Sequence, residues 1–146
     1  MKEQLTAGVR WTDKMHFWGS GEYGHDVPVD YSPPLGDGQG YGGLDLLLMS
    51  LAACSAQTVM PLLQKMKQDV RGFTVTATGR RRTEHPTVLT AIALTFALEG
   101  EALSPELVEK AVRLSEEKYC PVWAMLKPSV SISRTITIGG RPIVPA

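Results

Sequence analysis

The chain has 146 residues, of which 43% are hydrophobic and 21% charged, so it is long enough to form one domain with a hydrophobic core. Its 15 basic and 15 acidic side chains cancel. Without a net positive charge, neither nucleic acid nor an anionic membrane is an expected partner. We therefore expect a single domain over residues 1–146 that recognises small molecules or other proteins locally.

Neither the N-terminus of the chain nor its cysteine content indicates a secreted or membrane protein. The sequence shows no uninterrupted apolar run of the roughly 20 residues that a membrane-spanning helix needs. The N-terminus, Met1-Lys2-Glu3-Gln4, lacks the apolar segment of a signal peptide. Two cysteines, Cys54 and Cys120, are too few for a disulfide framework or for a zinc site made of cysteines alone. These features predict a soluble, cytoplasmic protein without a metal.

The first half of the chain predicts three short strands followed by a loop and a long helix. Strands are expected near residues 9–12, 15–18 and 25–30, because glycines and Asp13-Lys14 interrupt the apolar segments. Residues 31–43 hold two prolines and five glycines, which predicts a mobile loop. The helix from Leu44 is apolar on almost every side over its first turns, so we expect it to be central and covered all round.

The second half predicts a hairpin, two helices and a final strand. Apolar residues alternate over 73–78 and 88–98, as in paired strands. Ser104-Pro105-Glu106 is typical of a helix start. Cys120-Pro121 is a second such signal and places Cys120 at a helix N-terminus. With a last strand over 129–138 and a loose tail, the order is βββ-α-ββ-α-α-β, which predicts an α+β domain with an antiparallel sheet.

Cys54 and Cys120 are 66 residues apart, so only the fold can bring them together. The residues alone leave two interpretations open. One thiol is oxidised to a sulfenic acid that the other resolves to a disulfide, or both are inert cysteines of the core. The helix N-terminus favours a thiolate at Cys120, whereas Cys54, among apolar residues, needs a nearby cation.

Two segments carry a resemblance to a known family. The run Leu44-Asp45-Leu46-Leu47-Leu48-Met49-Ser50-Leu51-Ala52-Ala53-Cys54-Ser55-Ala56 resembles the long-helix signature of the OsmC/Ohr superfamily of osmotically induced and organic-hydroperoxide-resistance proteins. Glu117-Lys118-Tyr119-Cys120-Pro121-Val122 resembles its second cysteine motif. The element order agrees as well, over about residues 9–138. The chain looks closest to an uncharacterised OsmC-like branch.

The resemblance implies both a fold and a reaction. The fold is an antiparallel sheet wrapped on a long central helix, in an intertwined homodimer with two sites at the subunit interface. Cys54 is then the peroxidatic thiol that attacks a hydroperoxide, and Cys120 is the resolving thiol. A dithiol, of lipoyl type in the best-known branch, restores the pair. No metal, flavin or haem is implied, because the sulfur itself is oxidised and reduced.

One position departs from the family pattern. The peroxidase branches place a glutamate ten residues before the first cysteine, paired with an arginine that activates the thiol, and here that position is Leu44. Asp45 follows it and is expected to cap the helix or line the site. Arg10 is the candidate partner of Cys54, and His25 is a further candidate for lining the site.

This departure keeps other functions open. Besides the peroxidase, the sequence is compatible with a non-peroxidase dimer that senses redox state or binds a small ligand. A third reading is a structural dimer whose cysteines are inert.

Overall fold

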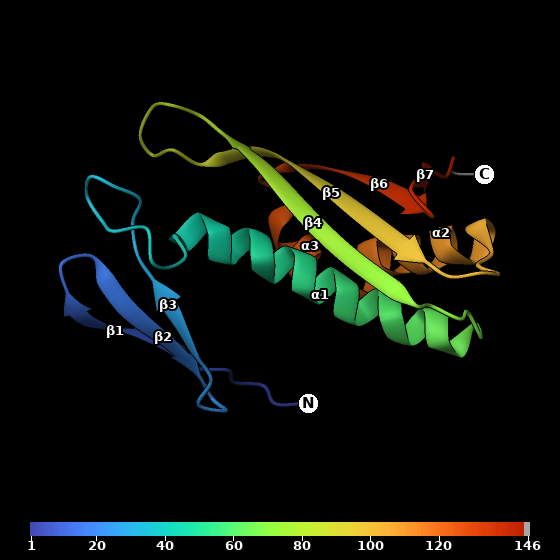
Figure 1. Ribbon diagram of the computed structural model, residues 1–146, viewed down its shortest axis with the longest axis horizontal. Coiled ribbons are helices and arrows are strands. Elements are labelled where there is room, and N and C mark those ends of the chain that lie inside the picture. Colours follow the sequence, from blue (N-terminus) through green and yellow to red (C-terminus); the bar gives the residue numbers. More distant parts are fainter. Residues whose placement is uncertain (145–146) are drawn as a thin grey trace. The chain divides into compact units, whose positions relative to one another are not determined.

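The computed structural model describes residues 1–144 (Figure 1). The chain divides into two compact units, unit 1 over Met1–Leu47 and unit 2 from Leu48 onward. The long helix α1 (Gly43–Lys65) begins in unit 1 and continues through unit 2. The expectation of a single domain over residues 1–146 stays a prediction.

Unit 1 is a three-stranded antiparallel sheet. The strands are β1 (Ala7–Asp13), β2 (His16–Gly21) and β3 (Asp26–Val29), in the order β1-β2-β3. Lys14, at φ 48°, makes the turn between the first two strands. The three predicted strands are therefore confirmed.

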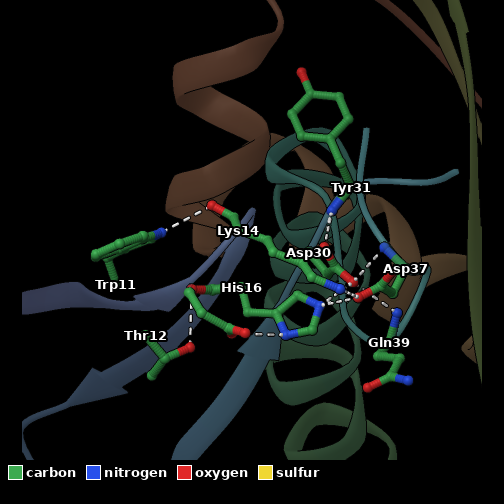
Figure 2. Close-up of polar contacts among 9 residues, drawn as sticks. Trp11, Thr12, Lys14, His16, Asp30, Tyr31, Asp37 and Gln39 are labelled. Carbon is green, nitrogen blue, oxygen red and sulfur yellow. Dashed lines mark hydrogen bonds and ion pairs between the residues drawn. The ribbon is translucent and has the colours of Figure 1, made fainter. Parts of the chain in front are cut away.

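A buried carboxylate holds the glycine-rich loop that follows β3. Asp30 is only 4% exposed. Its carboxylate accepts hydrogen bonds from the main-chain N–H groups of Tyr31 at 2.7 Å, Asp37 at 3.1 Å and Gln39 at 3.0 Å (Figure 2). The loop also packs too closely for side chains, since a Cβ at Gly36 would lie 2.1 Å from the Tyr31 carbonyl oxygen. The loop was expected to be mobile, but hydrogen bonds to Asp30 hold both its first residue and its middle.

His16 on β2 lies against this anchor. Its Nε2 lies 3.1 Å from Oδ2 of Asp30 and 3.0 Å from Oδ2 of Asp37 (Figure 2). Burial by itself would raise the pKa of Asp30. The N–H groups of Gln39, Tyr31 and Asp37, together with the charge of His16, outweigh burial and hold that pKa below its ordinary value. The fold therefore favours the ionised form of Asp30.

In unit 2, a four-stranded sheet has the order β4-β5-β6-β7. Its strands are β4 (Gly72–Arg81), β5 (Leu89–Glu99), β6 (Ser131–Ile138) and β7 (Arg141–Pro142). The pair β4–β5 is antiparallel, as expected for a hairpin, and the pair β6–β7 is antiparallel as well. The strand β7 corrects the expectation of a loose tail, because it pairs with Thr137 and Ile138.

The prediction of an antiparallel sheet is wrong for β5 and β6, which pair in parallel. Between them lie α2 (Pro105–Leu114), the π-helical turn η1 (Ser115–Tyr119) and α3 (Pro121–Leu126). A helical crossover of this kind returns the chain to the end of the sheet where it started, so the next strand runs in the same direction. The order of strands and helices along the chain was correctly predicted, but the parallel pairing that follows from this order was not.

The core of unit 2 lies on one face of its sheet. Alternate residues of β5 are buried, and the residues between them are exposed or half-buried. The helices contribute the remaining buried apolar residues. The largest fully buried apolar side chains are Phe96, Leu51, Leu63, Ile92, Leu94, Leu98, Val59, Val108 and Val112. The helices thus cover one face, while threonines such as Thr76 and Thr95 face solvent on the other.

The helix α1 has the length and composition of a membrane span, contrary to the sequence expectation. It has 23 residues, and its mean hydropathy reaches 1.7 over 18 residues. However, Leu51, Ser55, Val59 and Leu63 form a buried stripe with a spacing of four residues. The core helix of a soluble protein can have the same length and hydropathy, so these two properties alone do not indicate a membrane protein.

We expect Asp30→Asn to loosen the loop, because an amide cannot replace a carboxylate that accepts three N–H donors. The amides of Tyr31, Asp37 and Gln39 should then exchange with solvent about tenfold faster, as measured by NMR. Asp26→Asn, at an exposed position of β3, is the matched control and should leave them unchanged.

The same anchor predicts a pH dependence in the wild-type protein. Because the pKa of Asp30 is lowered in the folded state, its stabilisation is present above the ordinary carboxyl pKa. Protection of the three amides should be lost only as the pH falls through the lowered value. Equal exchange in the two variants, or loss of protection at neutral pH, would contradict this account of the loop.

Candidate thiol site

The structure brings the two cysteines together within unit 2. Cys54 lies on α1 and is half-buried, whereas Cys120, just before α3, is 2% exposed. Both are free thiols. The Cys120 thiol and the main-chain N–H of Val122 are both close enough to Cys54 to act on the pKa of its thiol. The fold therefore brings together two cysteines that are 66 residues apart in the sequence.

Local backbone geometry fixes the position of Cys120. The π-helical turn η1 ends there, and the N–H of Cys120 donates to the Ser115 carbonyl oxygen at 2.8 Å. Cys120 is the N-cap of α3, with Pro121 in the first turn, as the sequence predicts. Its Sγ accepts a hydrogen bond from the main-chain N–H of Trp123 at 3.4 Å. This sulfur consequently has a fixed donor that does not depend on any side chain.

Three hydroxyl groups join α1 to η1 and Cys120. Ser55 Oγ lies 3.7 Å from Cys120 Sγ. Thr58 Oγ1 hydrogen-bonds to Ser115 Oγ and to the carbonyl oxygens of Cys54, at 3.1 Å, and Ser55, at 3.0 Å. Ser55 and Ser115 are fully buried. The site is thus a small polar cluster enclosed by an apolar core.

Sequence reasoning missed this hydroxyl cluster. A signal was present, because Ser55 occupies a buried position between Leu51 and Val59 in the stripe of α1. A buried hydroxyl needs a hydrogen-bond partner, so its place in the stripe indicates a polar neighbour on another element. The sequence could not identify that neighbour as Cys120.

The surroundings of Cys54 disfavour its thiolate. Burial raises the pKa of Cys54, and the nearby Cys120 raises it further through a hydrogen bond and through charge. The N–H of Val122 acts in the opposite direction without reversing the shift. No cation is among the groups that act on Cys54 within residues 1–144. The cation that the sequence analysis required is therefore not supplied in the described structure.

An ion-pair cluster fixes the segment that leads to Cys120. The Arg134 guanidinium on β6 pairs with Glu116 of η1 at 2.6 Å and with Glu109 of α2 at 3.0 Å. Burial on its own would lower the pKa of Arg134, but its hydrogen bonds and the charges of the two carboxylates raise it overall. The always-charged guanidinium therefore ties η1 to the sheet.

The other candidate residues lie in unit 1. Arg10 is exposed on β1, opposite Trp18 of β2. Asp45 accepts a hydrogen bond from the Gly42 N–H at 2.9 Å, which gives it the expected capping contact at the start of α1. The part of these two residues in the site stays a prediction.

His25 lies beside a shallow apolar concavity of unit 1. The concavity has a volume of about 480 Å³, and Val9, Val27 and Leu46 are among its other lining residues. Leu44, at the position of the family glutamate, is half-buried in the first turn of α1. Among residues 1–144 no three His, Cys, Asp or Glu side chains are grouped as metal ligands.

Removal of the neighbouring thiol should make Cys54 ionise more readily. In Cys120→Ala the hydrogen bond and charge that raise the pKa of Cys54 are absent, while its burial remains. We expect the pH profile of Cys54 alkylation by iodoacetamide, followed by mass spectrometry, to move to lower pH. Ser115→Ala, which keeps Cys120, is the control. An unchanged profile, or one that moves to higher pH, would show that the two thiols do not interact.

Comparison with known proteins identifies relatives along nearly the whole chain. The family model described as OsmC-like protein matches residues 36–134. Protein YhfA of Escherichia coli (strain K12) is 36% identical over 134 residues, which cover 92% of this chain and 98% of YhfA.

Solved structures agree with this sequence similarity. A hypothetical protein from Aquifex aeolicus VF5 has a TM-score of 0.81 and 28% identity, over 94% of this chain and 97% of its own. An organic hydroperoxide resistance protein from Elizabethkingia anophelis has a TM-score of 0.69 and 17% identity, over 95% and 99%. This last similarity shows the shared fold. The resemblance to the OsmC/Ohr superfamily is confirmed, and the chain belongs to the OsmC-like protein family.

Proposed function

We propose that this protein is a thiol-dependent peroxidase that reduces organic hydroperoxides or hydrogen peroxide, with Cys54 as the attacking thiol and Cys120 as the resolving thiol. The proximity of the two free thiols in unit 2 is the observation that carries this proposal. The difference in their exposure supports the division of roles, since a peroxide must reach the attacking sulfur. The fold shared with an organic hydroperoxide resistance protein supports the choice of substrate.

The reaction uses sulfur alone. The Cys54 thiolate attacks the outer oxygen of the peroxide, so that an S–O bond forms and the O–O bond breaks. The leaving alkoxide takes a proton and becomes an alcohol, or water if the substrate is hydrogen peroxide. Cys54 is now a sulfenic acid. The Cys120 thiolate attacks the Cys54 sulfur, hydroxide leaves and takes a proton, and a disulfide forms. An external dithiol then reduces this disulfide and is itself oxidised.

A second function is favoured by the charges around Cys54. A peroxidatic thiol is normally activated by a lowered pKa, whereas burial raises the pKa of Cys54 here and no cation in the described chain offsets this. Leu44 occupies the position of the family glutamate. The alternative is a redox-sensing or ligand-binding protein, in which the pair forms a disulfide without rapid turnover.

We also propose that the protein is a homodimer. Unit 1 exposes several large apolar side chains, including Trp11 at 60%, Trp18 at 42% and Val9 at 62%. Met49 on α1 is 44% exposed although this helix is among the most apolar segments of the chain. Apolar surface of this extent is typical of a protein interface. A second copy of the chain would cover this apolar surface. It would also bury the exposed side of α1, as the apolar sequence of this helix predicts.

The peroxidase proposal is tested by turnover. Wild-type protein mixed with tert-butyl hydroperoxide and dihydrolipoamide should consume peroxide catalytically, as followed with a ferrous-iron dye assay. Cys54→Ser should consume it no faster than buffer, because no attacking sulfur remains. Without dihydrolipoamide, Cys120→Ser should react once and stop at a sulfenic acid that dimedone traps on Cys54.

Two outcomes distinguish the alternatives. A wild-type rate no higher than that of Cys54→Ser would exclude the peroxidase. If the wild-type protein then still formed the Cys54–Cys120 disulfide on mild oxidation, the redox-sensing function would replace it. If neither turnover nor a disulfide were detected, the cysteines would be inert residues of the core.

The dimer is tested by light scattering at micromolar concentration. We expect a mass twice the 15.9 kDa of one chain. Met49→Glu should shift the protein toward monomer, because it places a charge on the exposed apolar side of α1. Gln64→Glu, at a position on the same helix that is already polar and exposed, is the matched control. A folded wild-type monomer would contradict the proposal.

A further inference from the structure

Ser55 has a different environment from the other buried hydroxyl groups of the thiol site. Its side chain is fully buried, and Cys120 Sγ at 3.7 Å is its hydrogen-bond partner. A serine inside a helix commonly bonds back to the carbonyl oxygen of the preceding turn. Within residues 1–144 the Ser55 hydroxyl makes no such contact, so it is directed at the sulfur alone.

The hydroxyl groups of Thr58 and Ser115 hydrogen-bond to each other and not to either sulfur atom. Thr58 Oγ1 reaches two carbonyl oxygens and the Ser115 hydroxyl. Neither hydroxyl has a contact with the sulfur atoms of Cys54 or Cys120 among the hydrogen bonds of the described residues. These two groups therefore hold α1 and η1 together, whereas Ser55 acts on the reacting atom.

The direction of the Ser55 hydrogen bond depends on the state of Cys120. While Cys120 is a thiol, either group can donate. In a disulfide or a thiolate the sulfur has no hydrogen, so only the hydroxyl can donate. Cys120 Sγ then accepts from two donors, the Ser55 hydroxyl and the Trp123 N–H at 3.4 Å. Donors to a thiolate stabilise it, since a charge-assisted hydrogen bond is stronger than a neutral one.

We propose that Ser55 is a catalytic hydrogen-bond donor that stabilises Cys120 as the leaving thiolate when a thiol reductant attacks the disulfide at Cys54. This rests on the proposed function, because it requires the Cys54–Cys120 disulfide. The reductant thiolate forms a new S–S bond to Cys54 Sγ while the bond between the two cysteines breaks. The electron pair of that bond stays on Cys120 Sγ, where the Ser55 hydroxyl and the Trp123 N–H receive it. A second thiol of the reductant then releases Cys54.

Accessibility and hydrogen bonding both support attack at Cys54. Cys120 is 2% exposed and Cys54 is half-buried, so an external thiol reaches Cys54 more easily. The Ser55 hydroxyl and the Trp123 N–H lie at Cys120 Sγ, so the sulfur that leaves is the one with hydrogen-bond donors in place. The arrangement thus separates the roles, with an accessible sulfur for attack and a hydrogen-bonded sulfur to leave.

The test measures disulfide reduction in wild-type protein, Ser55→Ala and Ser115→Ala. Each protein is oxidised with diamide, the disulfide is verified by mass spectrometry, and its reduction by glutathione is followed after acid quenching. Both variants lose one buried hydroxyl, so Ser115→Ala controls for a general loss of stability, which thermal unfolding measures in parallel. We expect reduction to be about fivefold slower in Ser55→Ala than in Ser115→Ala, the effect of one net hydrogen bond.

The position of the mixed disulfide is the second readout. In wild-type protein glutathione should be attached to Cys54, and in Ser55→Ala a larger share should be attached to Cys120. Equal reduction rates in the two variants, or glutathione mainly on Cys120 in the wild type, would overturn the role of Ser55. Failure of the wild type to form the disulfide at all would instead overturn the proposed function on which this role rests.

Discussion

The contact between α1 and the turn that begins α3 is the interaction on which the thiol site depends. It places Cys54 beside Cys120, and the hydroxyl groups of Ser55 and Thr58 fix the distance between the two elements. The burial of Leu51, Val59 and Leu63 along the same side of α1 provides the free energy that keeps the polar groups in place. In a solvated site, hydroxyl groups would exchange partners with water. Here the apolar surroundings make each of these contacts costly to lose.

Much of the fold could be predicted from local signals. Alternation identified the strands, Ser104-Pro105 and Cys120-Pro121 marked two helix starts, and the glycines and prolines after residue 30 marked the loop. The features that were missed depend on residues distant in sequence or on chain direction. The parallel pairing of β5 and β6 follows from the crossover through α2 and α3, and periodicity carries no information about strand direction. Similarly, nothing in the sequence around Asp30 predicts that three later N–H groups would converge on its carboxylate.

The site could be predicted only in part, for the same reason. The family resemblance identified both cysteines, and the structure shows them as neighbours. The hydroxyl cluster was not predicted, because a serine or threonine in a helix has several possible partners and the sequence does not choose among them. The π-helical turn before Cys120 was also missed. Its extra residue per turn leaves no distinct hydrophobic pattern, yet it determines where the Cys120 N–H meets the Ser115 carbonyl oxygen.

The low acidity of Cys54 limits which chemistry the described chain can perform alone. Burial raises the pKa of Cys54 and so disfavours its thiolate, and protonated sulfur attacks peroxides poorly. A positive charge brought close to Cys54 would reverse this effect, because an opposite charge favours the thiolate. The ion pairs of Arg134 commit that guanidinium to Glu109 and Glu116, so it is not available for this purpose. If Cys54 is the attacking thiol that we propose, the charge that activates it comes from a group other than Arg134.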